Sequence, residues 1–264
     1  MNIFLRELKA NRTALIIWCA CMFLLVLSGM GKYTAYSSSG QPAAVFNDMP
    51  RSVKALLGMG PFDLSAMSGY FAMLFLYLEL AAAIHAVLLG SGMIAKEERD
   101  KTTEFLMVKP VSRNGVVSSK LLAALVNVAV LNIVTFLSSL VMVSAYNHGK
   151  DISGEVTAFI LSLFIVQLIF LSLGAALASF MKSPKASGSC SMGLLLAAFV
   201  ISKITDLTDR LNFLNLLSPF KYFSYPDIVD GKGLNLLVLA LSLALIAVFT
   251  LSVYFFYPRR DLSL

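Results

Sequence analysis

Residues 70–94 read YFAMLFLYLELAAAIHAVLLGSGMI, an apolar run interrupted by one carboxylate, Glu79, and one imidazole, His85. A helix needs about 20 mostly apolar residues to cross the hydrocarbon core of a bilayer, and this run is long enough. A surface helix of a soluble protein would carry polar residues along one face, and this run does not. The stretch therefore predicts a transmembrane helix.

Five further apolar blocks flank this run, and the composition agrees with a chain embedded in lipid. The protein has 264 residues, of which 58% are hydrophobic and 14% are charged, whereas a soluble domain carries about 25% charged residues. We therefore expect an all-α membrane protein with six transmembrane helices. The blocks predict a single transmembrane domain over residues 1–264, with spans at about 14–30, 70–94, 118–146, 156–180, 188–204 and 234–257.

The basic residues indicate how the chain is oriented. Most of the 21 Lys and Arg residues lie in the connections on the side of the two termini. Cytoplasmic connections carry such an excess, so we expect both termini in the cytoplasm. The net charge of +6 then follows from membrane topology and does not indicate a nucleic-acid partner. Cys19, Cys21 and Cys190 lie in apolar blocks without a His at zinc spacing, so no metal site is predicted.

Amphipathic segments accompany the spans. Apolar and charged residues alternate over residues 3–12, which favours a surface helix leading into the first span. The two outer connections before the second and sixth spans also contain apolar residues at helical spacing. The later one adds Phe220, Tyr222, Phe223 and Tyr225, as is typical of a membrane interface. These outer elements either pack at the interface or gate a substrate, and the sequence leaves both open.

The cytoplasmic connection at 95–117 is the most charged segment of the chain, yet it contains a compact apolar cluster. Residues 96–113 read KEERDKTTEFLMVKPVSR, with the cluster at 105–108. A purely solvated loop does not need such a cluster, whereas a short helix that docks into a groove of another protein does. An ordinary positive-inside loop is the alternative.

This segment contains, in order, Glu98-Arg99, Thr102-Thr103-Glu104, Phe105-Leu106 and Pro110-Val111-Ser112-Arg113, with Lys120 opening the next helix. The series resembles permeases of type-2 ABC exporters, which commonly show an acidic-basic run, Gly-Thr-x-Glu, apolar residues and Pro-Val-Ser-Arg before the third span. Lys101 departs from the pattern, because the family often has Gly there. The resemblance extends to the whole plan of six spans, the amphipathic N-terminus, the cytoplasmic element and the structured outer element.

The resemblance implies a dimeric permease, homomeric or heteromeric, in a bacterial cell membrane and coupled to two ABC ATPase subunits. The segment 97–113 would be the coupling helix with its flanks. Its site residues would be Phe105, Leu106 and Met107 as docking residues, Glu98, Arg99, Glu104 and Arg113 for charge pairing, and Thr102 and Pro110 in the matched motif. ATP and Mg²⁺ would bind the partner subunit, and we expect no cofactor on this chain. It has no Gly-x-x-x-x-Gly-Lys-Ser/Thr run, so we expect ATP hydrolysis on a separate partner chain and a transport subunit, not an enzyme, in this one.

Five polar residues inside the predicted spans are candidates for a substrate path: Glu79, His85, Asn127, Asn132 and Gln167. A charge near the bilayer centre is costly, so Glu79 is expected to face protein or water. Either it pairs with a nearby Asn, Gln or Lys, or it contacts a substrate or an ion. His85 lies about 120° round the helix from Glu79, which argues against an acid–base pair. The three amides favour hydrogen bonds between helices.

Small residues at helical spacing predict three close contacts between helices. We expect the set on the fifth span, Ser189, Gly193 and Ala197, at a packed interface, with an interface between protomers as one option. The three sets are Ala82, Ala86 and Gly90 on the face of Glu79; Gly174 and Ala178; and Ser189, Gly193 and Ala197.

An exporter permease is the favoured function, with an ion-coupled secondary carrier as the alternative. Such a carrier would use Glu79, perhaps with His85, as a proton site, but the two halves of the chain show no matched interrupted spans. An intramembrane enzyme is not supported, because neither His-Glu-x-x-His nor Gly-x-Ser-x-Gly occurs. The sparse charge along the spans favours an amphipathic or apolar substrate.

Overall fold

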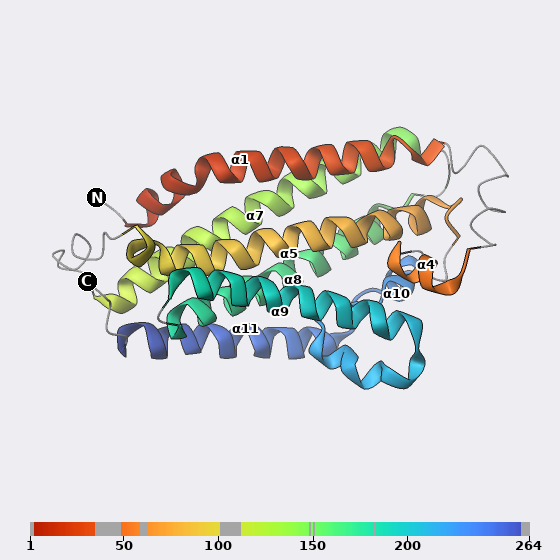
Figure 1. Cartoon of the computed structure of the whole chain (residues 1–264). Coiled ribbons are helices and arrows are strands. Elements are labelled where there is room, and N and C mark those ends of the chain that lie inside the picture. Colours follow the sequence, from red (N-terminus) through yellow and green to blue (C-terminus); the bar gives the residue numbers. More distant parts are fainter. Residues whose placement is uncertain are drawn as a thin grey trace.

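Figure 1 shows the computed structural model of the chain. The structure describes residues 3–34, 49–58, 63–100, 112–147, 149, 151–181 and 183–259, and these ranges contain helices and no strand. The α-helices are α1 (Ile3–Met30), α4 (Arg51–Leu56), α5 (Met67–Arg99), α7 (Arg113–Tyr146), α8 (Ser153–Phe180), α9 (Pro184–Leu207), α10 (Tyr225–Val229) and α11 (Leu236–Phe256). Three 3-10 segments complete the described chain: η1 (Asp209–Leu217), η2 (Pro219–Lys221) and η3 (Tyr257–Arg259).

Six of these helices are long and apolar enough to cross a membrane, namely α1, α5, α7, α8, α9 and α11. The expected all-α membrane fold with six spans is therefore confirmed. Five of these helices are longer than the apolar blocks, whereas α11 lies within its block at 234–257. The amphipathic start and the first span form one continuous helix from Ile3, α5 continues to Arg99, and α7 begins at Arg113. The added turns carry charged residues, because the helix and its backbone hydrogen bonds continue beyond the hydrocarbon core.

The six long helices lie side by side, and α1 begins at the same end of the bundle at which α11 ends (Figure 1). The short helices α4 and α10 lie at the opposite end. In the apolar 18-residue stretch of each helix, 67% of the residues are buried in α5 and 61% in α8, against 17% in α1 and 11% in α11. The two central helices thus form the core, and the outer helices present leucine-rich faces that suit contact with lipid.

Two glycines allow the central helices to approach closely. A Cβ atom added at Gly90 of α5 would lie 2.1 Å from the carbonyl oxygen of Leu171, and one added at Gly174 of α8 would lie 2.4 Å from that of Val87. Real Cβ atoms do not come so close to backbone, so both positions require glycine. This confirms the close contacts predicted at Gly90 and Gly174. Within the described chain the third small-residue set behaves differently, because Ser189, Gly193 and Ala197 are exposed.

The outer connection between α9 and α11 is not one amphipathic helix. The apolar spacing over 207–217 is realised instead as the end of α9 followed by the 3-10 segment η1. Burial comes from the aromatic residues that follow. The Phe220 ring packs 5.2 Å from that of Phe170 in α8 and 5.5 Å from that of Phe199 in α9, centroid to centroid. These contacts hold the outer segment against the core.

Candidate functional site

Buried ion pairs join three helices at the end of the bundle where α5 ends and α7 begins. Glu7 of α1 accepts hydrogen bonds from Arg6 at 3.0 Å and from Lys96 of α5 at 3.0 Å. Arg6 also donates to Glu97 of α5 at 3.2 Å. Lys120 of α7 is ion-paired with Glu97, and its Nζ donates to the carbonyl oxygen of Met93 as well. We call Arg6, Glu7, Lys96, Glu97 and Lys120 the ion network.

The inner members of the ion network have little contact with solvent. Glu7 and Lys120 have no exposed surface, and Glu97 is 6% exposed. Taking charges out of water is costly unless partners compensate, and removal of one partner of such a pair typically costs about 3–5 kcal/mol. The ion network therefore links the ends of three helices, and deleting one of its inner members would leave a buried charge with fewer partners.

The predicted coupling residues lie on both sides of this network. Glu98 and Arg99 are in the last turn of α5, and the Arg99 side chain pairs with Asp100 at 3.1 Å. Arg113 is the first residue of α7, and its Nη1 donates to the carbonyl oxygen of Pro258 at 2.8 Å. The remaining coupling residues, Thr102, Glu104, Phe105, Leu106, Met107 and Pro110, lie outside the described residues.

The sequence alone did not single out the ion network. Glu7 was one charge in an amphipathic pattern, Glu97 one in a charged run, and Lys120 the opening of a helix. The available signal was the placement of acidic and basic residues at the ends of long apolar blocks. It indicates charged helix ends, but it does not indicate which ends meet.

Glu79 meets the outer segment of the chain. Its carboxylate accepts a hydrogen bond from the hydroxyl of Tyr225 in α10, and Glu79 is 1% exposed. Phe75 and Phe159 pack edge-on against the Tyr225 ring, with centroids 5.4 and 5.8 Å away. Burial and the nearby carboxylate raise the pKa of Tyr225 well above its usual value, so the phenol keeps the proton that it donates. The partner is thus a tyrosine, where the sequence suggested an amide or a lysine.

The intramembrane amides include one bridge across three helices. Asn132 of α7 donates to the side-chain oxygen of Gln167 in α8, and Gln167 in turn donates to the carbonyl oxygen of Ala82 in α5 at 3.2 Å. Asn127 instead donates to Ala123, one turn earlier in its own helix, at 2.7 Å. Asn132 and Gln167 therefore link helices, as interhelical amides do in membranes.

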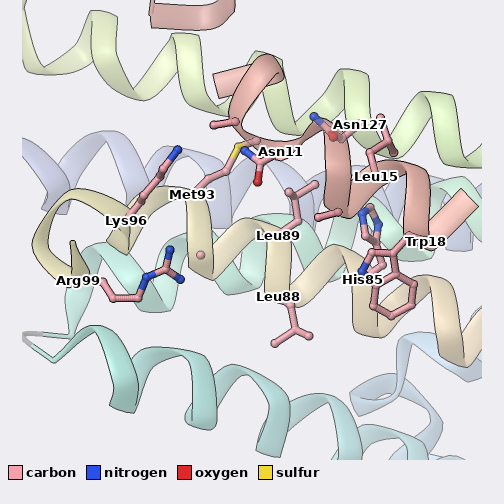
Figure 2. Close-up of a pocket in the computed structure, with 13 residues that line it drawn as sticks. Asn11, Leu15, Trp18, His85, Leu88, Leu89, Met93, Lys96, Arg99 and Asn127 are labelled. Carbon is pink, nitrogen blue, oxygen red and sulfur yellow. The ribbon is translucent and has the colours of Figure 1, made fainter. Parts of the chain in front are cut away.

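His85 lies apart from Glu79, against α1. Its ring packs 5.2 Å from the ring of Trp18, centroid to centroid, and the residue is 4% exposed. Its Nδ1 has no hydrogen-bond partner among the described residues. His85, Trp18 and Asn127 line a pocket between α1, α5 and α7 (Figure 2). The structure thus brings His85 and Asn127 to one site and pairs Glu79 elsewhere.

The six apolar helices define a multi-pass membrane protein. A family model described as "ABC-2 family transporter protein" matches residues 1–262, and the chain therefore belongs to the ABC-2 transporter family. It is a membrane permease of an ABC transporter, a transport subunit that is not itself catalytic. Comparison with individually curated proteins finds no match to this chain.

Proposed function

We propose that this chain is the permease subunit of an ATP-driven exporter. Two copies, or one copy and a related chain, form the substrate pathway, and two separate ATPase subunits bind ATP and Mg²⁺. Movement of the ATPase subunits reaches the spans through the segment 97–113. Both termini then lie in the cytoplasm, as the distribution of basic residues favours, and the membrane is that of a bacterial cell.

The ion network is the observation that carries this proposal. Glu97 and Lys120 lie at the two sides of the segment 101–111, and the network adds α1 through Glu7. A displacement of the intervening segment would pull α5 and α7 together, because moving one alone would separate a buried ion pair. The ion network would thus transmit movement of a docked subunit to α1, α5 and α7 together.

The exposed small residues of α9 support a dimer. Ser189, Gly193 and Ala197 share one face, and a Cβ atom added at Gly193 would meet nothing within 4 Å. Small residues at this spacing allow two membrane helices to pack closely. The second protomer therefore covers this face of α9 and completes the substrate pathway.

The proposal is tested by purification in mild detergent followed by mass spectrometry of the proteins that co-purify. Stoichiometric recovery of an ATPase subunit is expected from the natural chain, and its loss from the double variant Phe105→Asp, Leu106→Asp. The control is Val53→Asp, which places a charge at an exposed apolar residue at the other end of the bundle and should retain the ATPase.

Recovery of this chain alone in several mild detergents would contradict the proposal. An ion-coupled carrier would then be favoured, and Glu79→Gln would be the next variant to assay for transport. Retention of the ATPase by the Phe105, Leu106 double variant would contradict the docking site while leaving the ATPase partnership intact.

A further inference from the structure

A pocket of about 320 Å³ lies between α1, α5 and α7, near the end of the bundle that carries the ion network. Figure 2 shows Lys96 and Arg99 at one end of this pocket and Trp18 with His85 at the other. His85 and Lys96 are eleven residues apart on α5, so the pocket extends over about 16 Å along that helix. Its volume is at the small end of the range for ligand sites, about 300–1,000 Å³.

The wall between these two ends is apolar and reaches the surface of the bundle. It includes Leu15 of α1 and Leu88, Leu89 and Met93 of α5. Leu88 is 43% exposed, so the pocket opens toward the lipid-facing side. Gly92 lies in the same wall, and a Cβ atom added there would meet nothing within 4 Å. The missing side chain at Gly92 leaves room that a hydrocarbon chain can fill.

The end of the pocket at Lys96 and Arg99 is positively charged. Arg99, which is paired with Asp100, is 56% exposed at its side chain, and Lys96 is 26% exposed. Lys96 belongs to the ion network, in which three cations meet two carboxylates, so the network keeps an excess positive charge. Lys9 and Arg12 of α1 are exposed near the same end. An anionic group is therefore favoured at Lys96 and Arg99.

An apolar wall with a basic end fits one class of molecule. Basic pockets between transmembrane helices on the cytoplasmic side bind anionic lipid headgroups. We propose that this pocket binds an anionic phospholipid of the cytoplasmic leaflet. The phosphate lies on Lys96 and Arg99, and one acyl chain follows Leu88 and Leu89 toward Trp18. The assignment of leaflet rests on the proposed orientation of the chain.

A bound lipid would act on the part of α5 that leads into the segment 101–111. Arg99 is the last residue of α5, and Lys96 holds Glu7. A phosphate shared by these cations would hold the last turn of α5 in place and strengthen the transmission of movement from the segment 101–111 to α5. Anionic lipid thereby makes coupling depend on the composition of the inner leaflet.

Trp18 allows a direct test, because it is the only tryptophan of the chain and lines the pocket. The purified full chain is reconstituted in phosphatidylcholine vesicles that contain a minor fraction of phosphatidylglycerol brominated on its acyl chains. Bromine quenches tryptophan fluorescence only near contact. We expect several-fold stronger quenching than with the same fraction of brominated phosphatidylcholine, which reports ordinary lipid contact.

Three variants locate the effect. Gly92→Leu fills the pocket without changing charge and should abolish the preference for the anionic lipid. Arg99→Gln should lower that preference about five-fold, the effect of one basic residue near an anionic surface. Gly154→Leu is the control, because a Cβ atom there also meets nothing within 4 Å. Gly154 is the second residue of α8, a helix that does not line the pocket. This variant should keep the natural preference.

Equal quenching by the two brominated lipids would overturn the proposal. So would a preference for the anionic lipid that survives Gly92→Leu in a protein with an unchanged melting temperature, because the lipid would then be bound elsewhere. The assay contains no ATPase, so these outcomes are independent of the coupling experiment. A chain that recruits its ATPase and lacks the lipid preference would leave the proposed function standing.

Discussion

Lys120 and Glu97 form a buried ion pair between the first turns of α7 and the last turn of α5, on the two sides of the segment 101–111. We expect Glu97→Gln to lower the free energy of unfolding by about 3–5 kcal/mol, because it leaves the buried Lys120 charge without its carboxylate. Lys120→Met should cost less, because Glu97 keeps its ion pair with Arg6. Titration with a denaturing detergent measures this loss.

The double variant of these two residues should lose less than the sum of the single losses. Both charges are then absent, so no uncompensated charge remains. Additivity within about 0.5 kcal/mol would contradict the coupling of the two residues. Lys232→Gln is a suitable control, because its partners Asp227 and Asp230 are exposed and the pairs are at the surface. It should leave stability nearly unchanged.

Tyr225→Phe should loosen the outer segment from the core. The variant removes the donor to a buried carboxylate, which typically costs about 1–3 kcal/mol, and hydrogen exchange over 219–231 should become faster. Glu79→Gln should have a smaller effect, because its amide oxygen still accepts from Tyr225. Tyr222→Phe loses only a bond to Leu216 within the outer segment and serves as the control. Unchanged exchange in Tyr225→Phe would show that the contact does not anchor α10.

Gly90→Ala should disrupt the contact between α5 and α8, since the added Cβ atom would lie 2.1 Å from the Leu171 carbonyl oxygen. Overpacking of this kind costs about 1–3 kcal/mol or more. Gly92→Ala, two residues further along the same helix, meets nothing and should be neutral or stabilising by up to about 1 kcal/mol. Thermal stability followed by size-exclusion chromatography compares them. Equal melting temperatures would contradict the close approach of these helices.

Arg113→Glu should uncouple ATP hydrolysis from transport. The variant loses the hydrogen bond to Pro258 and reverses a charge at the start of α7. A hydrogen bond to a charged group contributes about 1.5–3 kcal/mol, so we expect about a ten-fold loss of substrate-stimulated ATPase activity in the reconstituted complex. Arg113→Lys, which keeps the charge, should retain more activity. Full stimulation in Arg113→Glu would remove this residue from the coupling site.

Gly193→Cys should form a disulfide-linked dimer in the membrane under oxidising conditions, if the exposed face of α9 is the protomer interface. The background is the triple variant in which Cys19, Cys21 and Cys190 are replaced by Ser. A disulfide requires Cα atoms within about 7 Å, so only residues near the dimer axis will link. Leu243→Cys on the exposed face of α11 is the control and should remain monomeric on a gel. Linking at Leu243 and not at Gly193 would place the interface on α11.

The six spans and the all-α fold could be predicted from the amino-acid sequence, because length and hydropathy are properties of each segment and need no knowledge of its neighbours. The sequence also indicated Gly90 and Gly174 as places of close approach, since helical spacing aligns small residues on one face. Five of the six helices are longer than their apolar blocks, because an apolar run indicates where the hydrocarbon core ends and the helix continues past it.

The pairing of polar groups between helices could not be predicted from the sequence and depends on how the helices pack. Glu79 pairs with Tyr225, 146 positions later, and Glu97 pairs with Lys120 while Arg6 and Glu7 reach the same cluster from α1. These partners depend on the rotation of each helix about its axis and on which helices become neighbours. Both are set by side-chain packing over the whole bundle, which no single segment of the sequence contains.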